Sequence, residues 1–168
     1  MQIYLDEKIG NPDLFTGRKR ELDSLLKWVE KIKIKISKSK AILSRRNTGK
    51  SALMQRLYNI IFDRNDKVVP FYFEIRETDQ WIGALSKRFF LSFIHQYIAF
   101  HSRNSEYLNY TNTYAMLVKA ATKEGLDHLV KHIEYFEHCE KEGDVDILWD
   151  EARDTPRIIA QYKDERVL

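Results

Sequence analysis

The residues best suited to chemistry in this sequence lie in segment 44–51, which reads Ser-Arg-Arg-Asn-Thr-Gly-Lys-Ser. This segment follows a short apolar run at 41–43 and precedes a helical pattern. A strand, a tight loop and a helix in this order are the setting of a phosphate-binding loop. Backbone N–H groups of the loop and of the first helical turn then point at the anion. The segment is therefore predicted to bind nucleotide phosphates.

The last residues of this loop each have an expected role. Lys50 would reach the β- and γ-phosphates, and the Ser51 hydroxyl would coordinate Mg²⁺. Gly49 suits a position where the backbone bends tightly and approaches the phosphate. The full pattern begins with glycine, but this chain has Ser44 at that position. An ordinary basic turn between a strand and a helix therefore remains the alternative.

Length and composition indicate one globular domain or part of a larger one, since 168 residues include 43% hydrophobic and 32% charged residues. A net charge of +3 is too small to argue for nucleic acid. The single cysteine, Cys139, excludes an intramolecular disulfide and fits a reducing compartment. The N-terminus does not resemble a signal peptide, and no apolar run approaches the ~20 residues of a membrane span. We expect a cytoplasmic protein that does not enter a membrane.

The first half of the chain reads as a strand–helix–strand unit. Residues 1–16 form an extended leading segment, and a helix is predicted from Lys19 into the thirties. Strands are expected at 41–43 and 68–75, with a helix at 52–61 between them. Such a unit implies a parallel sheet with a right-handed crossover.

The second half reads as helical. Helical patterns occur at 81–101, 114–121, 126–140 and 148–162. The last of them is interrupted by Pro156, where we expect a kink or a restart. The aromatic stripe of the first pattern is interpreted as core. The stretch 82–140 is therefore predicted to be a mostly helical insertion.

Three further patterns have both a functional and an ordinary interpretation. His128 and His132 have metal-ligand spacing, but no acidic third ligand lies at a recognisable offset, so an amphipathic helix is favoured. The lysines at 31, 33, 35, 38 and 40 could contact nucleic acid but more often form a solvated face. Residues 145–151 offer carboxylates after apolar residues, as a Walker B strand does, but we interpret them as a helix start.

A second motif precedes the loop. Residues 15–22 read Phe-Thr-Gly-Arg-Lys-Arg-Glu-Leu. Together with segment 44–51 they resemble the prokaryotic AAA+/STAND-type P-loop ATPases, the archaeal-type ATP-binding proteins. In that family a Phe-x-Gly-Arg-x-x-Glu-Leu segment precedes the phosphate loop.

This resemblance implies an α/β fold, a P-loop NTPase core whose parallel sheet is flanked by helices. It also implies ATP and Mg²⁺ as cofactors, with Ser51 as the metal ligand. The family's adenine–ribose side corresponds here to Phe15, Gly17 and Arg18. Its phosphate side corresponds to Asn47, Thr48, Gly49, Lys50 and Ser51, the first two through backbone amides.

Relatives in that family continue from a helix resembling 155–160 into a Walker B strand, whereas this chain stops near Val167 and Leu168. The resemblance therefore implies one domain over 1–168 that is the N-terminal part of an incomplete AAA+ domain. Hydrolysis is expected to be weak or absent, and no catalytic residue is assigned. Self-association or a protein partner would supply the missing half of the nucleotide site. The alternative is a non-catalytic protein-interaction module that has lost nucleotide binding.

Overall fold

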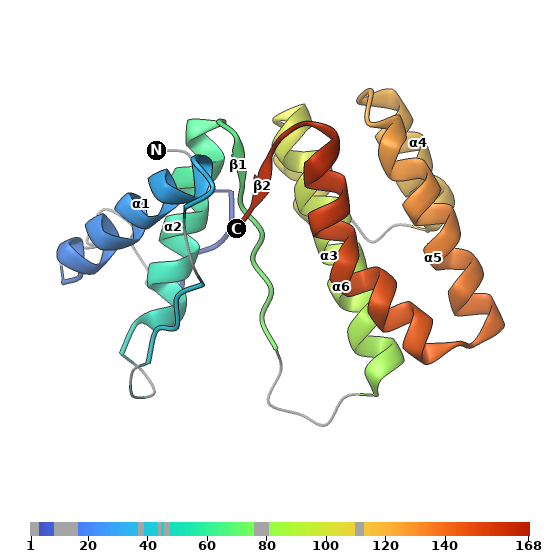
Figure 1. Cartoon of the computed structure of the whole chain (residues 1–168), viewed down its shortest axis with the longest axis horizontal. Helices are drawn as coiled ribbons and strands as arrows, with labels where there is room; N and C mark the ends of the chain where they lie inside the picture. The colour runs from blue at the N-terminus through green and yellow to red at the C-terminus, as the bar shows by residue number, and fades with distance from the viewer. Residues whose placement is uncertain are drawn as a thin grey trace. The chain divides into compact units, whose positions relative to one another are not determined.

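The computed structural model of this chain describes residues 4–8, 17–36, 39–43, 45, 48–75, 81–109 and 113–168. The chain divides into two compact units (Figure 1). The first comprises residues 1–72 together with Leu168, and the second comprises residues 73–167.

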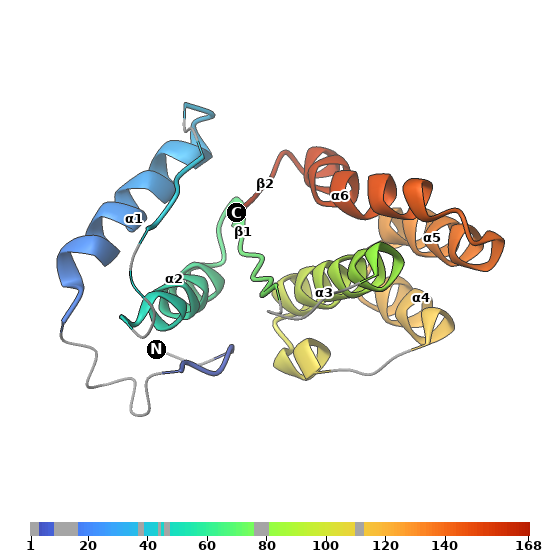
Figure 2. The same cartoon turned by 90° about the horizontal axis from the view of Figure 1, so that it is seen from below.

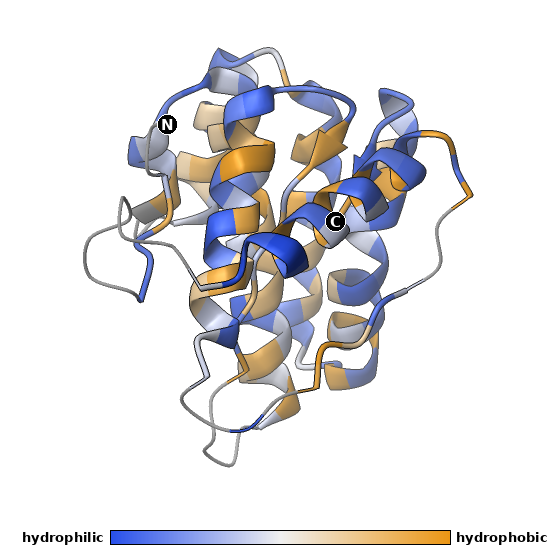
Figure 3. Cartoon of the chain, turned by 90° about the vertical axis from the view of Figure 1, so that its left-hand side faces the viewer, coloured by the Kyte–Doolittle hydropathy of each residue, from blue (hydrophilic) through white to orange (hydrophobic). Residues whose placement is uncertain are grey.

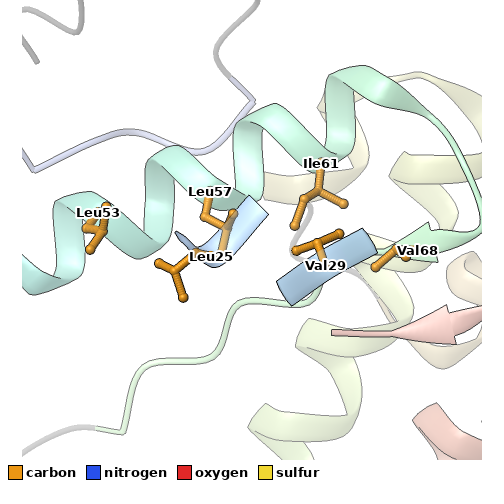
Figure 4. Close-up of a cluster of buried hydrophobic side chains, with 6 residues drawn as sticks. All are labelled: Leu25, Val29, Leu53, Leu57, Ile61 and Val68. Carbon is orange, nitrogen blue, oxygen red and sulfur yellow. The ribbon is translucent and has the colours of Figure 1, made fainter. Parts of the chain in front are cut away.

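The first unit is built on two helices, α1 (Lys19–Lys33) and α2 (Lys50–Arg64). Apolar residues of α2 recur at every fourth position, so they line one face of the helix and meet the buried face of α1. The helices pack around a small core (Figure 4), formed by Leu25, Val29, Leu53, Leu57, Ile61 and Val68. Helix α2 ends where Asn65 adopts a left-handed conformation with φ of 49°.

Strand structure is sparse. The strands of the described ranges are β1 (Val68–Val69) in the first unit and β2 (Arg166–Val167) in the second, each only two residues long. Within the first unit, the N–H of Leu168 donates to the Val69 carbonyl at 3.0 Å, and its carbonyl accepts from the N–H of Phe71 at 2.7 Å. Leu168 thus bonds to the residues before and after Pro70, and this is the hydrogen-bond pattern of parallel strands.

The predicted α/β P-loop NTPase core is therefore wrong, because helices hold 69% of the described residues and the two strands among them have only two residues each. The expected strand at 41–43 is absent, and Leu43 is 92% exposed, which does not suit a buried strand. The expected strand at 68–75 shortens to two residues. Pro70 directly follows them and has no N–H to donate to a ladder.

The second unit is helical (Figure 2). Its elements are α3 (Ile82–Ser102), η2 (Ser105–Asn109), α4 (Tyr114–Lys123), η3 (Asp127–Leu129), α5 (Val130–Glu142), α6 (Val145–Tyr162) and β2. Helix α3 packs against α6, and α5 packs against both α4 and α6. The predicted helices of this half are thus confirmed, with ends that shift by a few residues.

Aromatic side chains form much of the interior of this unit. The rings of Phe90 on α3 and Phe136 on α5 stack in parallel, with centroids 4.0 Å apart and both side chains fully buried. Phe93, Tyr97 and Phe100 of α3 are also buried. The interpretation of this stripe as core is confirmed. Orange apolar and blue polar residues alternate along the helices (Figure 3), as expected when each helix buries one face.

Helix α6 begins where the sequence predicted a helix start. The Asp144 carboxylate accepts a hydrogen bond from the N–H of Ile147 at 3.1 Å and so caps the helix. Pro156 lies inside α6 and is buried. Every helix in the described part of the chain is too short or too polar to cross a membrane.

Candidate functional site

The N-terminal end of α2 carries the residues predicted to hold phosphate. Gly49 is the N-cap residue, with φ of 76° and ψ of 20° in the left-handed region. A Cβ atom there would meet nothing within 4 Å, so the backbone angle rather than crowding favours glycine at this position. Lys50 and Ser51 follow as the first two residues of the helix, Lys50 exposed and Ser51 half-buried.

This helix end is electrostatically suited to an anion. No side chain caps it, and its first turn contains no acidic residue. The first N–H groups of a helix have no partner within the helix, and the helix dipole adds positive potential there. Just before the helix, the Thr48 hydroxyl donates to the Arg45 carbonyl at 2.8 Å.

A cavity of about 560 Å³ lies in the same unit. Its walls come from α1, from residues 40–43 and from the first turn of α2, and they comprise Arg18, Arg20, Glu21, Ser24, Leu25, Lys40, Ala41, Ile42, Leu43 and Leu53. Three cationic side chains, one carboxylate, one hydroxyl and five apolar side chains thus line the cavity. A ligand with an apolar part and an anionic substituent matches this lining.

The structure brings some of the predicted site residues together but not all of them. Arg18, the residue before α1, lines the cavity, and Leu53 brings the first turn of α2 to it. Gly17 is exposed next to Arg18 and is not in the lining. The loop residues, Thr48, Gly49, Lys50 and Ser51, are also outside it. Phe15 and Asn47 lie outside the described residues.

In the second unit, the two histidines with metal-ligand spacing have other neighbours. His132 Nδ1 lies 2.7 Å from Glu151 Oε1, and the Thr155 hydroxyl donates to the same carboxylate oxygen at 3.1 Å. This network joins α5 to α6. Across the residues that the structure describes, His, Cys, Asp and Glu form no group of three or more that could hold a metal ion.

A partly buried polar cluster in this unit joins residues that the sequence analysis did not connect. Tyr97 donates its hydroxyl proton to Glu165 at 2.9 Å, and His101 Nε2 lies 3.3 Å from the same carboxylate oxygen. The ring of His128 lies edge-on to Tyr97, with centroids 5.9 Å apart. Glu165 is more than sixty positions from its partners in the chain, so no spacing rule could have found the cluster.

Two pKa values in this cluster are shifted downward. Burial lowers the pKa of His128, and the nearby charges of Lys163 and His101 lower it further. Burial alone would raise the pKa of Glu165, but its contacts with His101 and Tyr97 outweigh that effect and lower it. Both groups therefore bind protons less readily in the folded chain than in the unfolded chain.

Acidification is accordingly expected to destabilise the second unit. The contribution of His128 is complete above its unfolded pKa of about 6.5 and is lost as the pH falls below it. The contribution of Glu165 is lost at lower pH, as the pH falls through its depressed folded value. The test is to measure thermal unfolding midpoints of the natural chain and of His128→Gln from pH 8 to pH 4. Between pH 7 and pH 5.5 the midpoint of His128→Gln should fall less than that of the natural chain. Parallel profiles in that interval would refute the role of His128.

The lysine run proposed for nucleic acid is partly neutralised. Lys33 Nζ lies 2.5 Å from Asp66 and 2.9 Å from Glu30. The contact with Asp66 is the main reason that the pKa of Lys33 is raised. Lys40 Nζ lies over the ring of Trp28 at 5.9 Å from its centroid. These two lysines are engaged within the unit.

Compared with protein-family models, with curated proteins and with solved structures, the chain matches none of them.

Proposed function

We propose that this chain binds the phosphates of Mg-ATP at the N-terminal end of α2. The observation that carries the proposal is the left-handed Gly49 at a helix end with neither a side-chain cap nor an acidic residue in its first turn. Lys50 would contact the β- and γ-phosphates, and Ser51 would hold Mg²⁺. The exposure of Lys50 supports the proposal, because an incoming phosphate can reach it.

The 560 Å³ cavity would take the base and ribose. Arg18 lies in its wall, and Leu53 connects it to the turn that carries Lys50. The apolar side chains of the lining suit the faces of a purine, and its three cations suit the phosphate chain. The volume lies within the range of about 300–1,000 Å³ that is usual for small-molecule sites.

The proposal concerns binding and does not extend to a hydrolytic mechanism. Asp150 and Glu151 end the stretch 145–151 that was compared with a Walker B strand and interpreted as a helix start, and both lie on α6 in the second unit. Asp150 pairs with Arg153 at 3.0 Å, and Glu151 pairs with His132. The likeness to AAA+/STAND ATPases and a cytoplasmic location remain predictions from sequence.

Mg-ATP is expected to raise the thermal unfolding midpoint of the natural chain but not that of Lys50→Ala. A ligand that binds only the folded state stabilises it by about 2.7 kcal/mol at a hundred times its dissociation constant. Lys31→Ala removes a lysine that is also exposed, from the last turn of α1, and should keep the full shift. Equal shifts in the natural chain and Lys50→Ala, or no shift in either, would reject the phosphate site.

A protein-interaction module is the second candidate. Large apolar side chains are exposed in the first unit, with Ile34, Ile36 and Leu43 between 64% and 92% accessible. Exposed apolar side chains favour association when they form a contiguous patch. A molecular mass that rises with concentration and does not respond to nucleotide would support this candidate over nucleotide binding.

A further inference from the structure

Residues 4–8 lie against α2 in the manner of a bound peptide. The Asn59 side-chain oxygen accepts hydrogen bonds from the N–H groups of Tyr4 at 3.0 Å and Leu5 at 2.8 Å. The Asn59 amide nitrogen donates to the Leu5 carbonyl at 2.9 Å. One turn earlier on the helix, the Gln55 side-chain oxygen accepts from the N–H of Lys8 at 2.8 Å. Two side-chain amides thus bind four main-chain groups.

Side chains of the segment add selectivity. The ring of Tyr4 lies 4.0 Å from that of Phe62, and its hydroxyl donates to Asp63 at 3.4 Å. The Glu7 carboxylate lies 2.9 Å from Arg56 Nε through one oxygen. Its other oxygen accepts from the Asn59 amide at 3.0 Å. The segment therefore presents an aromatic residue first and a carboxylate three positions later.

The α2 face under this segment includes two buried side-chain amides. We define the docking face as Gln55, Arg56, Asn59, Phe62 and Asp63. Within it, Asn59 is 0% and Gln55 is 4% exposed. In the folded chain the segment supplies the hydrogen-bond partners of both amides, so another main chain with matching groups can make the same contacts.

We propose that the docking face is a peptide-binding site, and that its occupant in trans is residues 4–8 of a second copy of this chain. Every copy carries both the segment and the face, and they lie 47–59 positions apart in the sequence. An exchanged segment would make the same contacts as the native one. In one arrangement the segment binds its own chain, and in the other two copies exchange their segments. The balance between them depends on the protein concentration and on the effective concentration of the segment within its own chain.

The first test uses a labelled synthetic peptide of residues 1–8 and full-length chains. Leu5→Pro removes the N–H that Asn59 binds and leaves the docking face unchanged. The peptide should bind Leu5→Pro at least tenfold more tightly than it binds the natural chain, because the cis segment no longer competes. A peptide with proline at its fifth position is the matched control and should not bind. Equal binding by both chains, or binding by neither, would overturn the site.

The second test asks whether another copy supplies the segment. Leu5→Pro has an intact face without a usable segment, and Asn59→Leu has an intact segment without a usable face. Neither should self-associate, but an equimolar mixture should form a one-to-one heterodimer by native mass spectrometry. Gln55→Met replaces Asn59→Leu if the latter does not fold. A mixture that stays monomeric while Leu5→Pro binds the peptide would overturn the second copy as the occupant.

Discussion

Replacing Phe136 with alanine is expected to lower the free energy of unfolding of the second unit by about 4 kcal/mol. The Phe136 ring is fully buried, and it stacks on Phe90 at 4.0 Å with an interplanar angle of 5°. Its removal loses the transfer free energy of the ring and leaves a cavity between α3 and α5. Urea denaturation followed by circular dichroism measures the change.

Tyr135 supplies the control for this prediction. It precedes Phe136 on α5 but is 47% exposed. Tyr135→Ala should change the free energy of unfolding by about 0.5 kcal/mol or less, as is usual for surface substitutions. Similar losses in the two variants would mean that the stacked pair is not a principal element of this core.

Replacing Arg56 with methionine is expected to lower the free energy of unfolding of the first unit by about 3 kcal/mol. Methionine keeps the apolar stem but leaves the Glu7 carboxylate without its cation. That carboxylate is 0% exposed, so it cannot recover the interaction from water while the segment stays docked. Chemical denaturation measures the loss, and amide hydrogen exchange at Leu5 and Lys8 shows whether the segment remains in place.

Glu7→Gln combined with Arg56→Met should recover most of this loss, because the double variant buries no unpaired charge. Glu7→Gln alone is the matched single variant that completes the cycle. A double variant as unstable as Arg56→Met alone would show that packing of the arginine stem, rather than charge, accounts for the effect.

The helices were predictable because their signals are local. Apolar residues at helical spacing locate α1 and α3, and Gly143 with Asp144 marks the boundary between α5 and α6. The helix after the Gly-Lys-Ser tripeptide was also predictable, although α2 begins at Lys50 and ends at Arg64 rather than covering 52–61.

The strands and the docked segment were not predictable in the same way. Three apolar residues at 41–43 suit a strand or an irregular segment equally well, and only tertiary pairing decides between them. The contacts of Asn59 with Leu5 and of Tyr97 with Glu165 join residues more than fifty positions apart. Nothing in the spacing of such residues indicates that they meet. The sequence therefore located the candidate site at the N-terminal end of α2, whereas the cavity beside it could be found only from the structure.

Cys139 gives the second unit a native chemical probe of its own opening. It is the sole thiol of the chain, and it is 5% exposed on α5. A thiol reagent can reach it only when α5 separates from its neighbours, so the rate of modification reports that event without any introduced label. When reclosing is faster than modification, the rate gives the equilibrium between closed and open forms of the helical unit.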